Sequence, residues 1–332
     1  MTTIRISILA YEGCMGMEVF GLCDTLLVAN RVAQALEGAA SAPLFEVSVI
    51  SLTGVGVGAA GGLHIGTRRA PRKAPHLLVV PGMELSDRAS CLKPLTRLAP
   101  EVAYIARAFA KGTPIAAVCV GAFILGEAGL LDGRRATTSW LFAADLAQRF
   151  PSAQVDSSAL LVEDGGITTT GSFSATFDLA MHLIRRGASA KVGRAVARMA
   201  LLDERRASQA PYIDTRMLAR PEGTFAASVT AWLEQRLAEP YVLTVLAAAF
   251  HVSVRTMLRR FKEETGVSPL VHLQQARIGK AKLLLESTAQ SVAQITARVG
   301  YGDVATFGTL FKRIVGQSPA EYRRRVKMAA RQ

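Results

Sequence analysis

The chain has 332 residues, of which half are hydrophobic and a fifth are charged, and its formal net charge is +13. This composition is typical of a folded, soluble protein with room for two domains. No run of eighteen uninterrupted apolar residues occurs and the N-terminus does not resemble a signal peptide, so we expect a cytoplasmic protein with no membrane partner. The cysteines show neither a CxxC pair nor metal-ligand spacing, which predicts reduced thiols, no metal and no cofactor: Cys14, Cys23, Cys91 and Cys119.

The positive charge is concentrated near the C-terminus. Residues 226–332 hold 16 basic and seven acidic residues, a net of +9, whereas residues 1–190 have a net charge of only +1. Such a basic segment predicts a polyanionic partner, although a solvated basic surface explains the charge alone equally well.

The first 190 residues alternate between buried strands and helices, which predicts an α/β domain with a mostly parallel sheet covered on both faces. The predicted strands are 4–10, 45–51, 76–82 and 114–120, and the predicted helices are 18–37, 94–111, 121–130, 140–149 and 173–187. A hairpin with a Gly-Gly turn is expected at 161–171.

A glycine pattern in this domain imitates a dinucleotide-binding motif. Gly56, Gly58 and Gly61 fit GxGxxG after a strand. The motif must open a helix, yet residues 63–71 have no helical pattern and end at Pro71. We therefore interpret the segment as a glycine-rich turn.

Cys119 lies where the strand at 114–120 turns sharply into the next helix, an elbow that exposes a nucleophile and directs backbone N–H groups at a substrate. Together with the VVPGM segment at 79–83, this elbow resembles the PfpI branch of the class I glutamine amidotransferase-like superfamily, over about residues 3–187. The resemblance implies a flavodoxin-like fold, places Glu18 beside the cysteine and assigns the oxyanion hole to Gly82 and the N–H of Val120.

The base that a catalytic cysteine needs, usually a histidine, is missing. Where relatives in this superfamily place histidine, the chain has Val120, Ser139 or the Thr170 region, and none of its five histidines falls in a matching position. We therefore expect no catalytic residues, with Cys119 and Glu18 as vestiges of a former site.

We predict instead that the elbow binds a small-molecule effector, for which a helix N-terminus favours a carboxylate. The predicted effector-binding residues are Glu18, Gly82, Cys119, Val120, Ser139 and Thr170. The alternatives are a pocket without a ligand and a redox-sensing Cys119, since a helix N-terminus lowers the pKa of a thiol.

The two domains are expected to meet in a short connecting region. Residues 191–210 have a helical pattern, and the segment 211–224 breaks it with two prolines and a glycine. The predicted organisation is an effector-binding domain at 1–190, a helix and linker at 191–225, and an all-α domain at 226–326.

The all-α domain contains two helix-turn-helix patterns about fifty residues apart. In the first, a helix ends near Phe250, Ser253 caps a second helix, and Gly266 stops it. In the second, Ser291 caps a helix that a Gly-Tyr-Gly turn separates from a helix at 303–314. A single helix from Ser268 to Ser287 is expected to space the two units apart.

In each unit, one helix carries an apolar pair for the core and polar residues for the major groove. Met257 and Phe261 form the first pair and Phe307 and Phe311 the second. The predicted DNA-binding residues are Ser253, Arg255, Leu258, Arg259, Lys262, Ala305, Thr306, Thr309, Lys312 and Arg313. Since small side chains dominate the second helix, we predict that the first unit reads bases and the second mainly contacts phosphates.

Residues 226–326 resemble the AraC/XylS family of DNA-binding domains. The resemblance rests on positions throughout the segment, including Ala247-Ala248, Phe261-Lys262, Ser268-Pro269, Arg277, Val299-Gly300-Tyr301, Phe311-Lys312 and Ser318-Pro319. Thr309 departs from the arginine usual in the family, which weakens base reading by the second unit. Joined to a PfpI-like domain, this segment resembles the GlxA group of transcriptional regulators.

These observations predict a transcription regulator that binds promoter DNA, responds to an effector, works with RNA polymerase and forms a homodimer, the last on the resemblance alone. Two alternatives remain at this point. One is a cysteine-dependent amidase or isonitrile-hydratase-like enzyme, against which the missing histidine counts. The other is a constitutive architectural DNA binder, against which two recognition helices at a fixed separation count.

Overall fold

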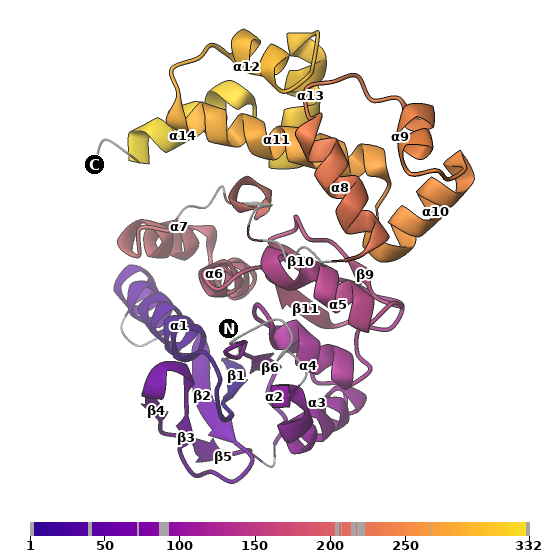
Figure 1. The fold of residues 1–332 in the computed structure, drawn as a ribbon. Helices are drawn as coiled ribbons and strands as arrows, with labels where there is room; N and C mark the ends of the chain where they lie inside the picture. The colour runs from indigo at the N-terminus through magenta and orange to yellow at the C-terminus, as the bar shows by residue number, and fades with distance from the viewer. Residues whose placement is uncertain are drawn as a thin grey trace. The chain divides into compact units, whose positions relative to one another are not determined.

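The structure is a computed structural model that describes residues 3–38, 42–71, 73–85, 93–202, 206, 208–213, 217, 223–265 and 267–329. Cys91, the predicted helix stop at Gly266 and most of the predicted linker at 211–224 lie outside these residues. The chain divides into two compact units, residues 1–209 and residues 210–332 (Figure 1).

The first unit is built on a seven-stranded sheet in the order β10-β11-β7-β6-β1-β2-β5. All neighbouring strands are parallel except β10 and β11, which form the hairpin around Gly165 and Gly166. Its strands are β1 (Ile4–Leu9), β2 (Phe45–Ser51), β5 (Arg68–Arg69), β6 (Leu77–Val80), β7 (Ile115–Ala117), β10 (Leu161–Asp164) and β11 (Ile167–Thr170). This confirms the predicted mostly parallel α/β fold.

Two groups of helices pack with this sheet, and Figure 1 shows the central strands between them. α1 (Gly16–Glu37), α6 (Ala175–Gly187) and α7 (Ala190–Met199) contact one another, as do α2 (Lys93–Arg97), α3 (Ala99–Ala110) and α4 (Gly121–Glu127). The smaller elements are η3 (Trp140–Phe142), α5 (Ala143–Arg149), β8 (Arg135–Ala136) and β9 (Gln154–Val155). Because helices cover both faces, the central strands β6 and β7 consist only of buried apolar residues.

Two helix predictions need correction. The helix expected at 94–111 is split into α2 and α3 at Leu98. The helix expected at 191–210 ends at Met199, because Leu201 has a φ of 54°, a left-handed conformation that ends an α-helix.

α1 is the one helix in the described part of the chain that is long and apolar enough to cross a membrane by length and composition. That test is weak evidence, since core helices of soluble proteins also pass it. In the fold, α1 buries Leu22, Leu26 and Ala29 and contacts β2, α6 and α7.

The glycine-rich segment opens no α-helix. Instead, β3 (Val57–Gly58) pairs with β4 (His64–Ile65) in antiparallel fashion across the 3-10 turn η1 (Ala60–Gly62). Gly61 has a φ of 74° within that turn. The interpretation as a glycine-rich turn is confirmed.

The second unit consists of helices around two apolar cores. They are α8 (Phe225–Gln235), α9 (Leu243–Ala249), α10 (Val254–Thr265), α11 (Pro269–Ser287), α12 (Val292–Arg298), α13 (Val304–Val315) and α14 (Pro319–Ala329), preceded by the 3-10 turn η4 (Ala210–Tyr212). The first core is formed by α8, α9 and α10, with Leu273 of α11. The second core joins the rest of α11 to α12, α13 and α14. α11 therefore belongs to both cores, which confirms the predicted spacing helix.

Candidate functional site

Cys119 adopts the sharp elbow that the sequence predicts between β7 and α4. Its φ is 53°, a conformation that non-glycine residues rarely adopt. A Cβ at Gly121 would lie 2.7 Å from the carbonyl oxygen of Val80 and 2.8 Å from that of Pro81. Only glycine therefore lets α4 begin this close to the end of β6, and the Cys-Val-Gly sequence fits the turn for that reason.

The Cys119 thiol is surrounded by groups from four chain segments. It interacts with the N–H groups of Val120 and Phe173, with the Ser139 hydroxyl and with the Glu18 carboxyl. The Cys119 carbonyl also accepts a hydrogen bond from the Thr138 hydroxyl at 2.7 Å. We call Glu18, Gly82, Cys119, Val120, Ser139 and Phe173 the elbow site.

Glu18 is fully buried at the start of α1. Burial raises the pKa of its carboxyl to about 7, while the Gly82 N–H and the Cys119 thiol pull that pKa down. The Gly82 N–H donates to Glu18 Oε2 at 2.5 Å. Since this donor is already used within the protein, the oxyanion-hole role assigned to Gly82 needs correction.

The Cys119 thiol is protonated at neutral pH. Burial and the neighbouring Glu18 carboxyl raise its pKa to about 12, although the Val120 N–H, the Phe173 N–H and the Ser139 hydroxyl act in the opposite direction. The expectation that a helix N-terminus lowers this pKa is therefore wrong, because α4 is short and burial outweighs its dipole.

The other predicted effector residues lie at different depths. Val120 and Ser139 are buried beside the thiol, and Cys119 itself is partly exposed. Thr170 is fully buried in β11, where its hydroxyl donates to the Ala117 carbonyl at 3.5 Å. The Thr170 hydroxyl is thus bonded to the neighbouring strand β7, and Thr170 is not among the groups that influence the Cys119 thiol.

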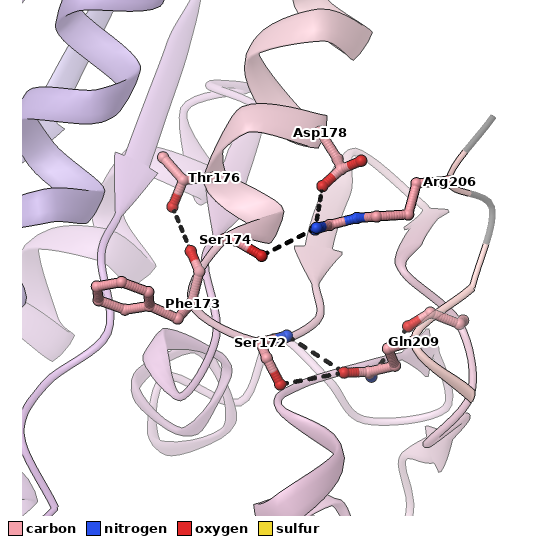
Figure 2. Close-up of polar contacts among 8 residues, drawn as sticks. Ser172, Phe173, Ser174, Thr176, Asp178, Arg206 and Gln209 are labelled. Carbon is pink, nitrogen blue, oxygen red and sulfur yellow. Dashed lines mark hydrogen bonds and ion pairs between the residues drawn. The ribbon is translucent and has the colours of Figure 1, made fainter. Parts of the chain in front are cut away.

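Sequence reasoning missed three residues around the elbow site. The Ser139 hydroxyl lies 2.9 Å from the Ser172 hydroxyl, and Ser172 in turn contacts Gln209 (Figure 2). Phe173, next along the chain, brings its N–H to the thiol. Ser172 and Phe173 could have been predicted as site residues, because they follow closely after the strand β11. Nothing in the sequence near Gln209 indicates that it lies close to this site.

None of the five histidines, all within the described residues, is among the groups that influence the Cys119 thiol. His182 on α6 instead lies 3.2 Å from Glu163 of the hairpin. A thiol with a raised pKa and without an adjacent imidazole lacks the activation that cysteine nucleophiles use.

The first recognition helix, α10, presents the predicted polar face to solvent. Arg255, Leu258, Arg259 and Lys262 are exposed, while Met257 and Phe261 on the opposite face are fully buried. The Ser253 hydroxyl caps the helix by accepting the Thr256 N–H at 3.1 Å. Arg259 forms an ion pair with Glu263 one turn later, at 2.9 Å.

The second recognition helix, α13, is equally well packed but differently equipped. Phe307 and Phe311 are fully buried, and the exposed face carries Ala305, Thr306 and Thr309, followed by Lys312 and Arg313. Its cap is a carboxylate, since Asp303 accepts the Thr306 N–H at 2.6 Å. This hydrogen bond lowers the pKa of Asp303, so the carboxylate is ionised at neutral pH.

Arg277 of α11 connects the two helix-turn-helix units. It is 7 % exposed and donates to the carbonyl oxygens of Leu237, at 2.7 Å, and Glu239, at 2.5 Å. Its guanidinium lies 5.1 Å from the ring centroid of Tyr301, in the turn before α13. This buried cation fixes loops of both units to the helix that spaces them.

Comparisons with known proteins agree with this two-part architecture. Residues 32–186 match the DJ-1/PfpI family and residues 246–325 match a helix-turn-helix domain. The chain is 29% identical to the HTH-type transcriptional regulator GlxA of Rhizobium meliloti, over 97% of this chain and 96% of that protein. It is 26% identical to the HTH-type transcriptional regulator GbdR of Pseudomonas aeruginosa, over 88% of this chain and 78% of that protein.

Among solved structures, Drosophila melanogaster DJ-1beta is similar to this chain with a TM-score of 0.48 and 18% identity, over 61% of this chain and 100% of that one. The family matches and the observed sheet confirm a flavodoxin-like α/β domain followed by a helical, AraC-type DNA-binding domain.

Proposed function

We propose that this chain, which joins a DJ-1/PfpI domain to an AraC-type helix-turn-helix domain, is a sequence-specific regulator of promoters that responds to a small molecule. Residues 226–326 bind DNA and residues 1–190 bind the effector. DNA binding is supported by the exposed polar face of α10, since Met257 and Phe261 on the opposite face are packed in the core. A helix held in this way can enter a major groove with its N-terminal half.

The DNA-binding part is tested by selecting sequences from a random duplex pool with the full chain. We expect one enriched site that covers two successive major-groove segments, about ten base pairs apart. Affinity for that site should fall steeply with salt, because basic residues displace counterions from phosphates. A pool without enrichment, or an affinity insensitive to salt, contradicts the proposal.

The elbow site is the proposed effector site. Its support is the convergence of Glu18, Ser139 and the Phe173 N–H on a partly exposed Cys119. A thermal-shift screen of small carboxylates, amino acids, amines and betaines tests this. A ligand that stabilises the wild-type chain should lose its effect in Ser139→Ala. Stabilisation that survives in Ser139→Ala would place the ligand elsewhere.

A catalytic role is disfavoured. The fold family includes enzymes, but here the thiol has a pKa of about 12 and the N–H of Gly82 is bonded to Glu18. Cysteine nucleophiles act as thiolates and need a base to form them. Hydrolysis of amides or hydration of isonitriles that disappears in Cys119→Ala would establish the enzyme alternative.

Three further properties belong to the proposal. A promoter-binding regulator works beside RNA polymerase, the resemblance to GlxA-type regulators suggests a homodimer, and the reduced cysteines suggest a cytoplasmic location. Light scattering of the full chain tests the dimer, and transcription in vitro from a selected site tests the link to RNA polymerase.

A further inference from the structure

The connector, our name for the chain between α7 and η4, ends in a deeply buried glutamine. The structure describes its residues 200–202, 206, 208 and 209. Gln209 is 3 % exposed. Its Oε1 accepts hydrogen bonds from the Trp140 N–H and the Ser172 N–H, both at 3.2 Å. Its Nε2 donates to the carbonyl oxygens of Thr138, at 2.8 Å, and Ala159, at 3.1 Å. One side chain thus joins three loops of the first unit.

Two of these loops carry the groups that surround the Cys119 thiol. Ser139 lies between Thr138 and Trp140, and Phe173 follows Ser172. The hydroxyls of Ser139 and Ser172 are 2.9 Å apart, and the Ser172 hydroxyl donates to Gln209 Oε1 at 3.3 Å. Hydrogen bonds therefore link the connector, through Ser172, to Ser139, whose hydroxyl influences the pKa of the Cys119 thiol.

The Gln209 side chain is packed closely against its neighbours. A Cβ at Gly171 would lie 2.8 Å from Gln209 Oε1, so this position needs glycine while Gln209 is in place. Earlier in the connector, Arg206 pairs with Asp178 at 2.5 Å and donates to the Ser174 hydroxyl at 3.0 Å (Figure 2). Ser208 donates to the Ser158 carbonyl at 2.6 Å, and Ser158 is not among the residues that influence the pKa of the Cys119 thiol.

The residues directly after Gln209 are anchored in the DNA-binding unit. Ala210 and Pro211 are buried in η4, which contacts the recognition helix α13. The Lys282 ammonium of α11 donates to the Ile213 carbonyl. The Arg325 guanidinium of α14 lies 5.2 Å from the Tyr212 ring centroid. Adjacent stretches of chain are therefore fixed in two different units.

We propose that Gln209 is a positioning residue that couples occupancy of the elbow site to the segment entering the DNA-binding unit. The inference rests on the proposed effector function. A molecule that engages the Ser139 hydroxyl competes with the Ser172 hydroxyl for it, and Ser172 is itself hydrogen-bonded to Gln209. Occupancy of the elbow then loosens the connector where it joins η4, and by reciprocity loosening the connector opens the elbow.

The effect of the connector on the elbow site is measured as the rate at which Cys119 is alkylated in the full chain. Iodoacetamide is the probe, and the reaction is followed by mass spectrometry at pH 8.5. We expect Gln209→Ala to raise the rate of alkylation by at least about fivefold. Gln209→Met, which keeps the length of the side chain but removes its hydrogen bonds, should do the same. Ser208→Ala, which removes a connector bond to a residue outside the elbow site, is the matched control and should stay within about twofold of wild type.

The effect of elbow-site occupancy on the connector can be measured without any substitution in the connector. Wild-type chain alkylated at Cys119 should exchange amide hydrogens faster in peptides spanning 206–213 than unmodified chain, whereas peptides of β1 should not change. A thermal-unfolding midpoint within a few degrees of wild type shows that the glutamine variants are folded.

The proposal is overturned if Gln209→Met alkylates at the wild-type rate, if Ser208→Ala accelerates the reaction equally, or if alkylation leaves exchange at 206–213 unchanged. Selection of a DNA site by the full chain distinguishes failure of the coupling from failure of the proposed regulator function. A selected site without coupling rejects the inference alone, and coupling without a selected site rejects the regulator function.

Discussion

The two helix-turn-helix units have the same packing and different surfaces. Met257 and Phe261 in α10 and Phe307 and Phe311 in α13 are all fully buried at equivalent positions. The exposed faces differ, with Arg255 in the first unit where Ala305 stands in the second, and likewise Arg259 against Thr309. The repeat has kept the residues that fold each helix-turn-helix unit, whereas the residues that we propose to contact DNA have diverged.

The caps extend this difference to charge. Ser253 brings a neutral hydroxyl to the N-terminus of α10, whereas Asp303 brings an ionised carboxylate to that of α13. Both satisfy free N–H groups equally well. A carboxylate, however, repels phosphate from the end of a helix that otherwise attracts it. We therefore propose that the second helix-turn-helix unit contacts phosphates through Lys312 and Arg313, at the opposite end of its helix.

The largest effects should be equal in the two units. Phe261→Ala and Phe311→Ala, at equivalent positions, each leave a cavity in a closed core, which costs about 3–5 kcal/mol of local stability. Hydrogen exchange resolved by peptide should show this loss in α8–α10 for the first variant and in α12–α14 for the second. A loss confined to one variant would show that the two cores are not equivalent.

The two helix-turn-helix units should differ in how strongly they determine base preference. Arg259→Ala should cost about 1–3 kcal/mol of affinity for the selected site and relax the base preference under the first unit. Its ion pair with Glu263 is exposed, so breaking that pair adds little to stability. Thr309→Ala is the matched change in α13 and should cost less in a titration of the same duplex. A larger cost for Thr309→Ala would reverse the proposed roles.

Phosphate contact by the second unit should appear in the salt dependence. Lys312→Ala should weaken binding to all sequences alike and reduce the slope of log affinity against log salt by about one. Titrations of specific and random duplexes at several salt concentrations measure this. A change in base preference without a change in slope would mean that Lys312 reads bases.

Periodicity and turn chemistry predicted most of the fold. The four central strands, the elbow at Cys119 and the capped helices at Ser253 and Ser291 all follow from residues within a few positions of each other. The helix expected at 191–210 failed because the chain's local pattern does not show that Leu201 leaves the helical region.

The site was harder to predict than the fold, because its contacts join distant segments. The Gly82 N–H is taken by Glu18, 64 positions earlier, and Gln209 reaches Thr138 across 71 positions. Whether a donor is free for a ligand depends on such pairings, and spacing along the chain does not contain them. The raised pKa of Cys119 has the same origin, since burial outweighs the local helix terminus.

The smallest predicted effect isolates the caps from the recognition residues. Asp303→Ser should leave α13 as stable as before, because serine and aspartate cap comparably. DNA affinity should rise on the order of twofold at low salt, since a negative charge leaves the helix end. The reciprocal variant, Ser253→Asp, should lower affinity by more, because α10 approaches the bases through its N-terminal half. Both changes in affinity should become smaller at high salt, because salt screens the charge. If both variants bind DNA as tightly as wild type at low salt, the caps do not contribute to the difference between the two helix-turn-helix units.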